Sequence, residues 1–307
     1  MKNTKDWEKI KNALTKNLGT SIPFLEDIID HIIFTNNNFS RSSFLIQCAG
    51  LFRISDQKIL DVCTTLEFLH TASTLHRNLN EFESARRNQL YVKNILGTEA
   101  SVLLGDYLLS ISFKILTRLG NLDVLECVSL ATKNISRGQV LEINDQTYLE
   151  SPKHWYKVIR NKIAGLYGAG AKSAAYLGNA SRETASKLFS FGEHFGIATQ
   201  LKKDLDTIHD KKIIQQKLKN QVLWSPLCFL IHDCMRDSER IKILEKLIIP
   251  SDKKDISEEI INQFEKFEMS EILKTEARKE LRKAAFFVNK LEIDTSKIHP
   301  LTIYSNI

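Results

Sequence analysis

The chain has 307 residues, of which 43% are hydrophobic and 26% charged, values typical of a globular protein with a sizeable core. The net charge of +6 is spread over segments in which basic and acidic residues alternate, which favours solvated helix surfaces and excludes a nucleic-acid-binding patch. Glycine (12) and proline (5) are few for this length, and since both interrupt helices, a mostly helical protein is expected.

The five cysteines (Cys48, Cys63, Cys127, Cys228 and Cys234) lack the spacing of metal ligands. Each lies among apolar neighbours, which predicts buried free thiols in a reducing compartment. No apolar run reaches the ~18 residues of a membrane span. Asp106 interrupts the most apolar stretch, so no transmembrane segment is expected.

In chain order, residues 1–20 form a Lys-rich amphipathic pattern that predicts an N-terminal helix at the periphery of the fold. Asp6 and Glu8 argue against a transit peptide, which usually lacks acidic residues. Phe24, Ile28 and Ile32 then recur at helical spacing. Polar connectors predict loops at 35–43, 144–155 and 249–255.

The segment 94–119 is apolar on nearly all faces, and a helix of that kind must be buried on most sides. Further on, Ile260, Phe264 and Phe267 share a helix face, and Asp255 and Glu258 are spaced as a capping box. Helical periodicity continues over 270–291. Since no strand alternation or repeat is visible, the sequence predicts a single all-α domain over 1–307.

The segment 69–88 (LHTASTLHRNLNEFESARRN) is amphipathic and gathers histidines and arginines towards one end, which is unusual in a core. The block 69–110, followed by 158–170 (VIRNKIAGLYGAG) and 191–206 (FGEHFGIATQLKKDLD), resembles the trans-prenyl diphosphate synthases in order and spacing. This resemblance implies the isoprenoid-synthase fold, a helical bundle around a central cavity. Active members of that family couple isopentenyl diphosphate to an allylic diphosphate, using two DDxxD motifs that hold three Mg²⁺ ions.

In this chain both DDxxD motifs are degenerate. The first falls on Arg77, Asn78, Leu79, Asn80 and Glu81, and the second on Lys203, Asp204, Leu205, Asp206 and Thr207. At the family's aspartate positions, two cations now cancel two carboxylates, so the site cannot hold three hard divalent cations. We therefore expect no metal, cofactor or catalytic residue in this chain, and Mg²⁺ in a catalytic partner. Asp206 and Asp210 lie one helical turn apart beside His209, a spacing that is common on helix surfaces.

Other parts of the family's diphosphate sites are unevenly kept. The GKRxRP motif falls on 38–43 (NFSRSS), which keeps only a displaced Arg41, and Gln139 replaces the glutamate of a GExxQ-like turn. By resemblance, the residues that can still bind a diphosphate are His70, Arg86, Arg87, Lys162 and Gln200. Each also has a structural reading: His70 as a core histidine, the arginine pair as a helix C-terminal cap, and Lys162 as a surface lysine.

The pattern is most similar to the aspartate-less, non-catalytic subunit of heteromeric long-chain polyprenyl diphosphate synthases, of the decaprenyl diphosphate synthase subunit 2 type. That resemblance implies a heterotetramer with a catalytic subunit bearing both DDxxD motifs, joined through helices around 94–118 and 122–143. It also implies synthesis of the ubiquinone side chain, in mitochondria or, for a bacterial chain, in the cytoplasm. The alternatives are a divergent, metal-independent enzyme that binds prenyl diphosphates, or a homodimeric prenyl carrier.

Overall fold

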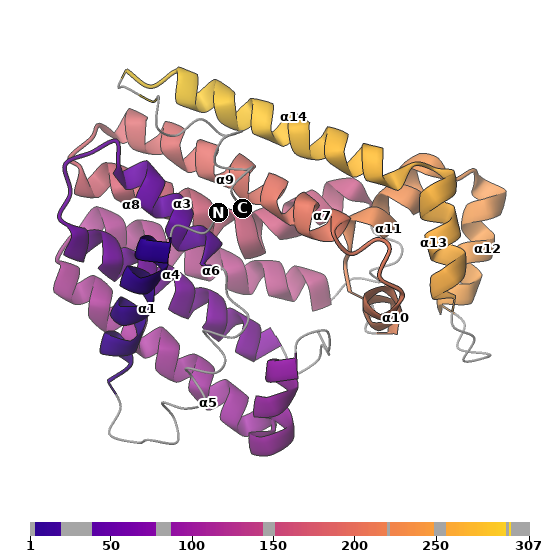
Figure 1. The fold of residues 1–307 in the computed structure, drawn as a ribbon, viewed down its shortest axis with the longest axis horizontal. Coiled ribbons are helices and arrows are strands. Elements are labelled where there is room, and N and C mark those ends of the chain that lie inside the picture. Colours follow the sequence, from indigo (N-terminus) through magenta and orange to yellow (C-terminus); the bar gives the residue numbers. More distant parts are fainter. Residues whose placement is uncertain are drawn as a thin grey trace.

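The computed structural model describes residues 4–19, 39–77, 87–143, 151–219, 222–248, 256–292 and 295. Every regular element in these ranges is a helix, which confirms the predicted all-α class (Figure 1). The helices are α1 (Thr4–Leu18), α3 (Ser40–Ala49), α4 (Asp56–Arg77), α5 (Arg87–Leu119), α6 (Leu122–Ile143), α7 (Pro152–Ile159), η2 (Arg160–Ala164), α8 (Gly165–Leu177), α9 (Arg182–Leu205), α10 (Lys211–Lys219), α11 (Ser225–Phe229), η3 (Leu230–Cys234), α12 (Asp237–Ile248), α13 (Ser257–Lys266) and α14 (Met269–Asn289).

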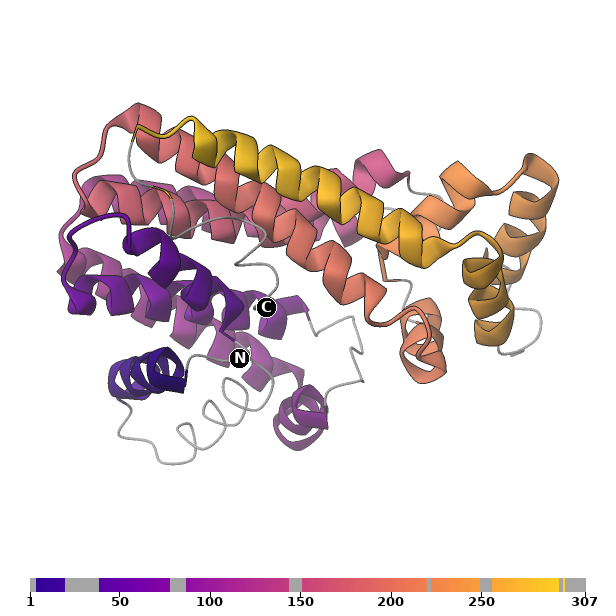
Figure 2. The same ribbon diagram turned by 45° about the horizontal axis from the view of Figure 1, so that its top comes forward.

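Helix α9 is central to the bundle, because it packs against α8 on one side and α14 on the other (Figures 1 and 2). Helices α3 and α6 pack on α8, and α4 packs along α5. Past the C-terminal end of α9, the shorter helices α10 to α13 gather at one end of the molecule. A second apolar cluster, which includes Trp155, Trp224 and Phe264, joins this end to the main bundle.

The contact between α8 and α9 depends on glycine. A Cβ atom on Gly192 would lie 2.5 Å from the backbone oxygen of Tyr167, and one on Gly196 would lie 2.8 Å from the Cα of Ala164. Contacts that short do not occur in folded proteins, so a larger residue at either position would push the helices apart. The glycines of α9 therefore explain why α8 and η2 lie so close to the helix that carries the second degenerate motif.

Helix α1 covers one side of the bundle, and its presence confirms the predicted N-terminal helix. Its apolar residues Ile10, Leu14 and Leu18 are buried in a cluster with Phe39, which precedes α3, and Phe68 of α4. The spacing i, i+4, i+8 places the three α1 side chains on one helix face. This cluster fixes the entry to α3, where the anchoring motif for isopentenyl diphosphate was sought.

The expectation that 94–119 is buried on most sides is wrong. Helix α5 packs along α4, yet Leu103 is 68% exposed and Phe113 is 40% exposed. On α6, Leu122, Leu130 and Val140 are also exposed. We refer to these five residues as the exposed apolar set of α5 and α6. These side chains are exposed because no described element covers them.

In length and composition, Glu99–Leu119 is apolar enough to cross a membrane, and it is the one such stretch within the described parts of the chain. In the fold, 44% of its most apolar window is buried against neighbouring helices. A central helix of a globular bundle meets the same criteria. Packing against neighbouring helices therefore covers part of this apolar stretch, and Leu103 and Phe113 are among its uncovered side chains.

Several local expectations need correction. The loop predicted at 35–43 ends earlier, because α3 begins at Ser40, and the loop predicted at 144–155 ends at Ser151, which caps α7. Asp255 of the predicted capping box lies outside the described residues, while the N-cap of α13 is Ile256 and Glu258 forms an ion pair with Lys211. The predicted face of Phe24, Ile28 and Ile32 and the loop at 249–255 lie outside the described residues.

All five cysteines are free thiols, and four of them are buried as predicted. Cys234 is the exception, because it is partly exposed. Burial raises the pKa of the Cys127 thiol to about 11. A thiol with a raised pKa is a poor nucleophile at neutral pH, so the buried cysteines act as small apolar residues.

A hydrogen bond between His194 and Glu280 fastens α14 to α9. His194 Nδ1 donates to Glu280 Oε2 over 2.6 Å, and Lys283 Nζ lies 2.6 Å from Glu280 Oε1. The His194 ring also stacks on Phe287, with 5.7 Å between centroids. Burial by itself would raise the pKa of Glu280, but the hydrogen bonds from His194 and Lys283 outweigh it and lower the pKa below its usual value.

A lowered pKa in the folded state means that ionised Glu280 stabilises the fold above its unfolded pKa, and that this contribution is lost as the pH falls below about 4. We expect Glu280→Gln to lower the free energy of unfolding at pH 7 by about 2 kcal/mol. The difference between the variant and the parent protein should shrink in acid. Urea denaturation at pH 7 and pH 3.5 measures both values. Glu271→Gln, which removes an exposed pair with Lys274 on the same helix, is the control and should leave the midpoint unchanged. A difference as large at pH 3.5 as at pH 7 would refute the role of the ionised Glu280 carboxylate.

Candidate functional site

The lysine position of the GKRxRP pattern is occupied by Phe39, which is fully buried. Its ring lies 5.8 Å from the ring of Trp7 in α1, and its backbone has the left-handed conformation, with φ of 48°. That conformation is unfavourable for a residue with a Cβ, so the surrounding packing must hold it. The position that the resemblance assigns to an anchor for isopentenyl diphosphate is therefore part of the apolar contact between α1 and the start of α3.

Arg41, the displaced remnant of the same motif, points into the core. Its side chain is 3% exposed and forms an ion pair with Glu67 at 3.3 Å, while its guanidinium lies 5.9 Å from the centre of the Tyr167 ring. Ser42 strengthens the arrangement, because both its hydroxyl (2.8 Å) and its backbone N–H (3.1 Å) donate to Glu67. A buried cation with such a counter-ion serves the packing of α3 on α4 and is closed to external anions.

Lys162 is buried too, so its reading as a surface lysine is wrong. It belongs to η2, a π-helical turn between α7 and α8, and its side chain is 6% exposed. Its ammonium forms an ion pair with Glu142 near the C-terminal end of α6, and the Glu142 side chain is 8% exposed. A π-helical turn shifts the direction of its side chains relative to the flanking helix, and such turns often occur at functional sites.

The C-terminal half of α6 has a glycine where the Lys162 side chain crosses it. A Cβ atom on Gly138, one turn before Glu142, would lie 2.6 Å from Cγ of Lys162, so only glycine lets the lysine stem cross α6 here. The neighbouring Gln139 donates its side-chain amide to the backbone oxygen of Ser73 in α4 at 2.7 Å. In the GExxQ-like turn, Gln139 occupies the glutamate position and Glu142 the glutamine position, so the two residue types are exchanged.

The one aspartate kept at a leading position of the second motif also points inward. Asp204 is 3% exposed and accepts hydrogen bonds from Gln200 Nε2 at 2.9 Å and from Ser225 Oγ at 2.5 Å. Burial raises the pKa of Asp204, although Lys217, Ser225 and Gln200 each oppose the shift. Asp204 thereby connects the end of α9 to the start of α11, and Gln200, expected in the allylic site, is bonded to it.

The remaining residues of the second motif do not form a cation site. Thr207 donates to the backbone oxygen of Asp204 at 2.7 Å, Asp206 is the C-cap of α9, and Lys203 is partly buried on the last turn of that helix. Asp210 accepts hydrogen bonds from the first backbone N–H groups of α10. Among the described side chains, no three of His, Cys, Asp or Glu gather closely enough to hold a metal ion.

Most of the first motif lies outside the described residues. Arg77 is the last residue of α4, Asn78 and Glu81 follow it in the undescribed part, and so does Arg86. Arg87 begins α5, so its reading as a cap at a helix C-terminus is wrong. His70 is on α4 and partly buried, and its carbonyl oxygen accepts the Ser73 hydroxyl at 2.7 Å.

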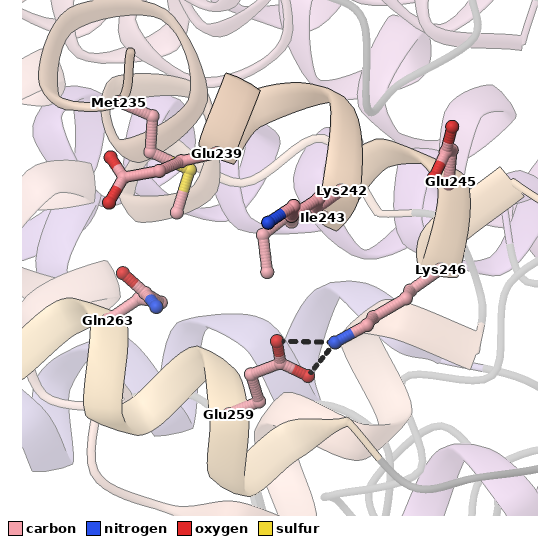
Figure 3. A pocket seen from close by; sticks show the side chains of 8 residues that line it. All are labelled: Met235, Glu239, Lys242, Ile243, Glu245, Lys246, Glu259 and Gln263. Atoms are coloured by element: carbon pink, nitrogen blue, oxygen red, sulfur yellow. Dashed lines mark hydrogen bonds and ion pairs between the residues drawn. The ribbon is translucent and has the colours of Figure 1, made fainter. Parts of the chain in front are cut away.

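Two surface pockets lie elsewhere. One, of about 230 Å³, is between α12 and α13, where Gln263 faces Met235 and Lys246 pairs with Glu259 at 2.6 Å (Figure 3). The other, of about 940 Å³, is an open cleft lined by α7, η2, η3 and α14. None of the candidate site residues lines either pocket, so neither pocket bears on the diphosphate sites.

Comparison with known sequences decides the family. The profile described as polyprenyl synthetase matches residues 22–264, most of the chain. The chain belongs to the polyprenyl synthetase family. An octaprenyl diphosphate synthase of Escherichia coli is 28% identical over 203 residues, which cover 65% of this chain and 62% of that protein. The octaprenyl diphosphate synthase of Haemophilus influenzae is 23% identical over 94% of this chain and 88% of its own length.

Solved structures show the same fold. A decaprenyl diphosphate synthase from Rhodobacter capsulatus superposes with a TM-score of 0.83 at 21% identity, covering 99% of this chain and 94% of that one. A heptaprenyl diphosphate synthase from Staphylococcus aureus gives a TM-score of 0.85 at 20% identity, covering 98% and 96%. The predicted isoprenoid-synthase architecture is thereby confirmed for this polyprenyl synthetase.

Sequence reasoning missed the partners of the retained residues. It singled out Lys162, Gln200 and Arg41, whereas the structure shows that carboxylates of the chain itself, Glu142, Asp204 and Glu67, bind all three. For Glu142 a signal existed, since a carboxylate stands at the glutamine position of the GExxQ-like turn. Glu67 and Ser225 carried no comparable signal.

We expect Ser225→Ala to lower the free energy of unfolding by about 1–3 kcal/mol, because it leaves the buried Asp204 carboxylate without its shortest hydrogen bond. Chemical denaturation at neutral pH measures the change. Ser136→Ala, on an exposed part of α6, is the matched control. Equal effects of the two substitutions would show that Asp204 does not depend on Ser225.

Proposed function

We propose that this polyprenyl synthetase is the non-catalytic subunit of a heteromeric long-chain polyprenyl diphosphate synthase. In this proposal it supports a catalytic subunit that makes the side chain of ubiquinone. The loss of metal ligands carries the proposal. A hard divalent cation requires anionic oxygen ligands, and the sequence places cations at 77 and 203, where the family has aspartates.

The contacts of the residues at the other motif positions support the same proposal. Asp204 accepts hydrogen bonds from the hydroxyl and the backbone N–H of Ser225 at the start of α11, so it can ligate a cation only if that contact breaks. Phe39 and Arg41 belong to the core, where they cannot anchor isopentenyl diphosphate. The relatives named above are synthases, and in this proposal their reaction belongs to the complex and not to this chain alone.

The proposed partner is a polyprenyl diphosphate synthase that bears both DDxxD motifs and binds Mg²⁺. Five of the seven large apolar side chains exposed in the described parts of the chain lie on α5 and α6. Exposed apolar residues in such numbers are typical of permanent interfaces, which are large and apolar. We therefore propose that the partner binds α5 and α6, within a heterotetramer. By the resemblance, the complex is mitochondrial in a eukaryote and cytoplasmic in a bacterium.

The direct test is an assay of Mg²⁺-dependent chain elongation by this chain alone, by a partner with both DDxxD motifs alone, and by the two co-purified. We expect no turnover from this chain and at least about a tenfold increase of the partner's activity in the mixture. Robust elongation by this chain alone would refute the proposal and would require Glu81, Asp204 and Asp206 to be tested as ligands. A stable homodimer that binds no synthase would favour the prenyl carrier.

The interface is tested separately with Leu130→Asp, which places a charge in the exposed apolar set of α6. We expect the affinity for the catalytic partner to fall by at least about tenfold with an unchanged melting temperature, because the side chain is half exposed in the isolated chain. Ile241→Asp on α12 is the matched control, since Ile241 is exposed to a similar degree (53% against 50%). Sedimentation of the mixed subunits measures both. An equal loss in the control would place the interface elsewhere.

A further inference from the structure

Lys162 has a counter-ion that belongs to the chain itself. The Glu142 carboxylate and the Lys162 ammonium are both more than nine-tenths buried and form an ion pair. They come from different parts of the sequence, α6 and η2, which pack against each other. A buried lysine without a counter-charge would be strongly destabilised, so this pair meets a physical requirement of the fold.

The Glu142 carboxylate gives the buried ammonium of Lys162 the counter-charge that a bound diphosphate would give it in a binding site. A diphosphate offers anionic oxygens to a buried ammonium, and Glu142 offers the same kind of oxygen from within the protein. Gly138 brings the lysine stem against α6, so that Lys162 reaches Glu142 one helical turn further on. Glu142 therefore places a negative charge at the position where the GExxQ-like turn has a neutral glutamine.

A second contact repeats the arrangement. Gln200, the other described residue of the expected allylic site on these elements, donates its amide to Asp204, which is buried and also bonded to Ser225. Helix α9 packs on η2, so Gln200 and Lys162, which are both bonded to carboxylates, lie on neighbouring elements. At both positions a donor that would face a diphosphate is held by a carboxylate of this chain.

We propose that Glu142 is an internal anion that closes the allylic diphosphate subsite at Lys162, so that this chain does not bind a diphosphate there. The inference deepens the proposed function and rests on its assignment of this site to diphosphate binding in the family. An external anion must displace Glu142, and the displaced carboxylate would then repel it. Removing the charge of Glu142 while keeping its shape should therefore open the subsite.

The test is titration calorimetry of each purified protein with inorganic pyrophosphate in Mg²⁺-free buffer. We expect no detectable binding by the parent protein, an affinity of Glu142→Gln at least about tenfold above the detection limit, and loss of that binding in Glu142→Gln/Lys162→Met. Glutamine retains an oxygen that accepts from Lys162, and the family pattern has glutamine at this position, so the fold should tolerate the change. Circular dichroism checks it.

Binding of pyrophosphate by the parent protein that is lost in Lys162→Met would overturn the inference, because the subsite would then be open despite Glu142. So would the absence of any gain in a folded Glu142→Gln variant. If that variant does not fold, the comparison of the parent protein with Lys162→Met still decides. These measurements use this chain alone, whereas the proposed function is judged by elongation with the partner, so each can fail without the other.

Discussion

The close contact between α8 and α9 is the constraint on which the rest of the site depends. Gly192 and Gly196 let α9 approach the backbone of α8 more closely than side chains would allow. η2, with Lys162, directly precedes α8, and Gln200 and Asp204 lie towards the C-terminal end of α9. The close approach of α8 and α9 therefore holds together the elements that carry the positions assigned to diphosphate binding by the family resemblance.

The charged groups of these elements follow one electrostatic rule. Each of the two buried cations is matched by a buried carboxylate: Arg41 by Glu67 and Lys162 by Glu142. In the low dielectric of a protein interior, an unmatched charge is costly. Both cations therefore have a counter-charge that belongs to the chain itself.

Sequence reasoning predicted the fold well because the family's three blocks and the helical periodicity are properties of neighbouring residues. It also selected candidate residues, such as Lys203 and Lys162, from their positions in the motifs, and their role in a diphosphate site stays a prediction. It could not predict what those residues bind, since Lys162 meets Glu142 from 20 positions away and Asp204 meets Ser225 from 21 positions away. The burial of 94–119 was overestimated because apolar composition does not show which faces of a helix meet a neighbour.

Phe39 bears on how sequences of this kind can change over time. Putting a lysine back at this position would place an ammonium group among Trp7, Phe68 and the apolar face of α1, with no described carboxylate in that cluster. The folded state would lose several kcal/mol before any substrate could bind. A charged residue at position 39 would therefore be tolerated only together with a repacking of α1, which couples two segments of the chain that are more than 20 residues apart in sequence.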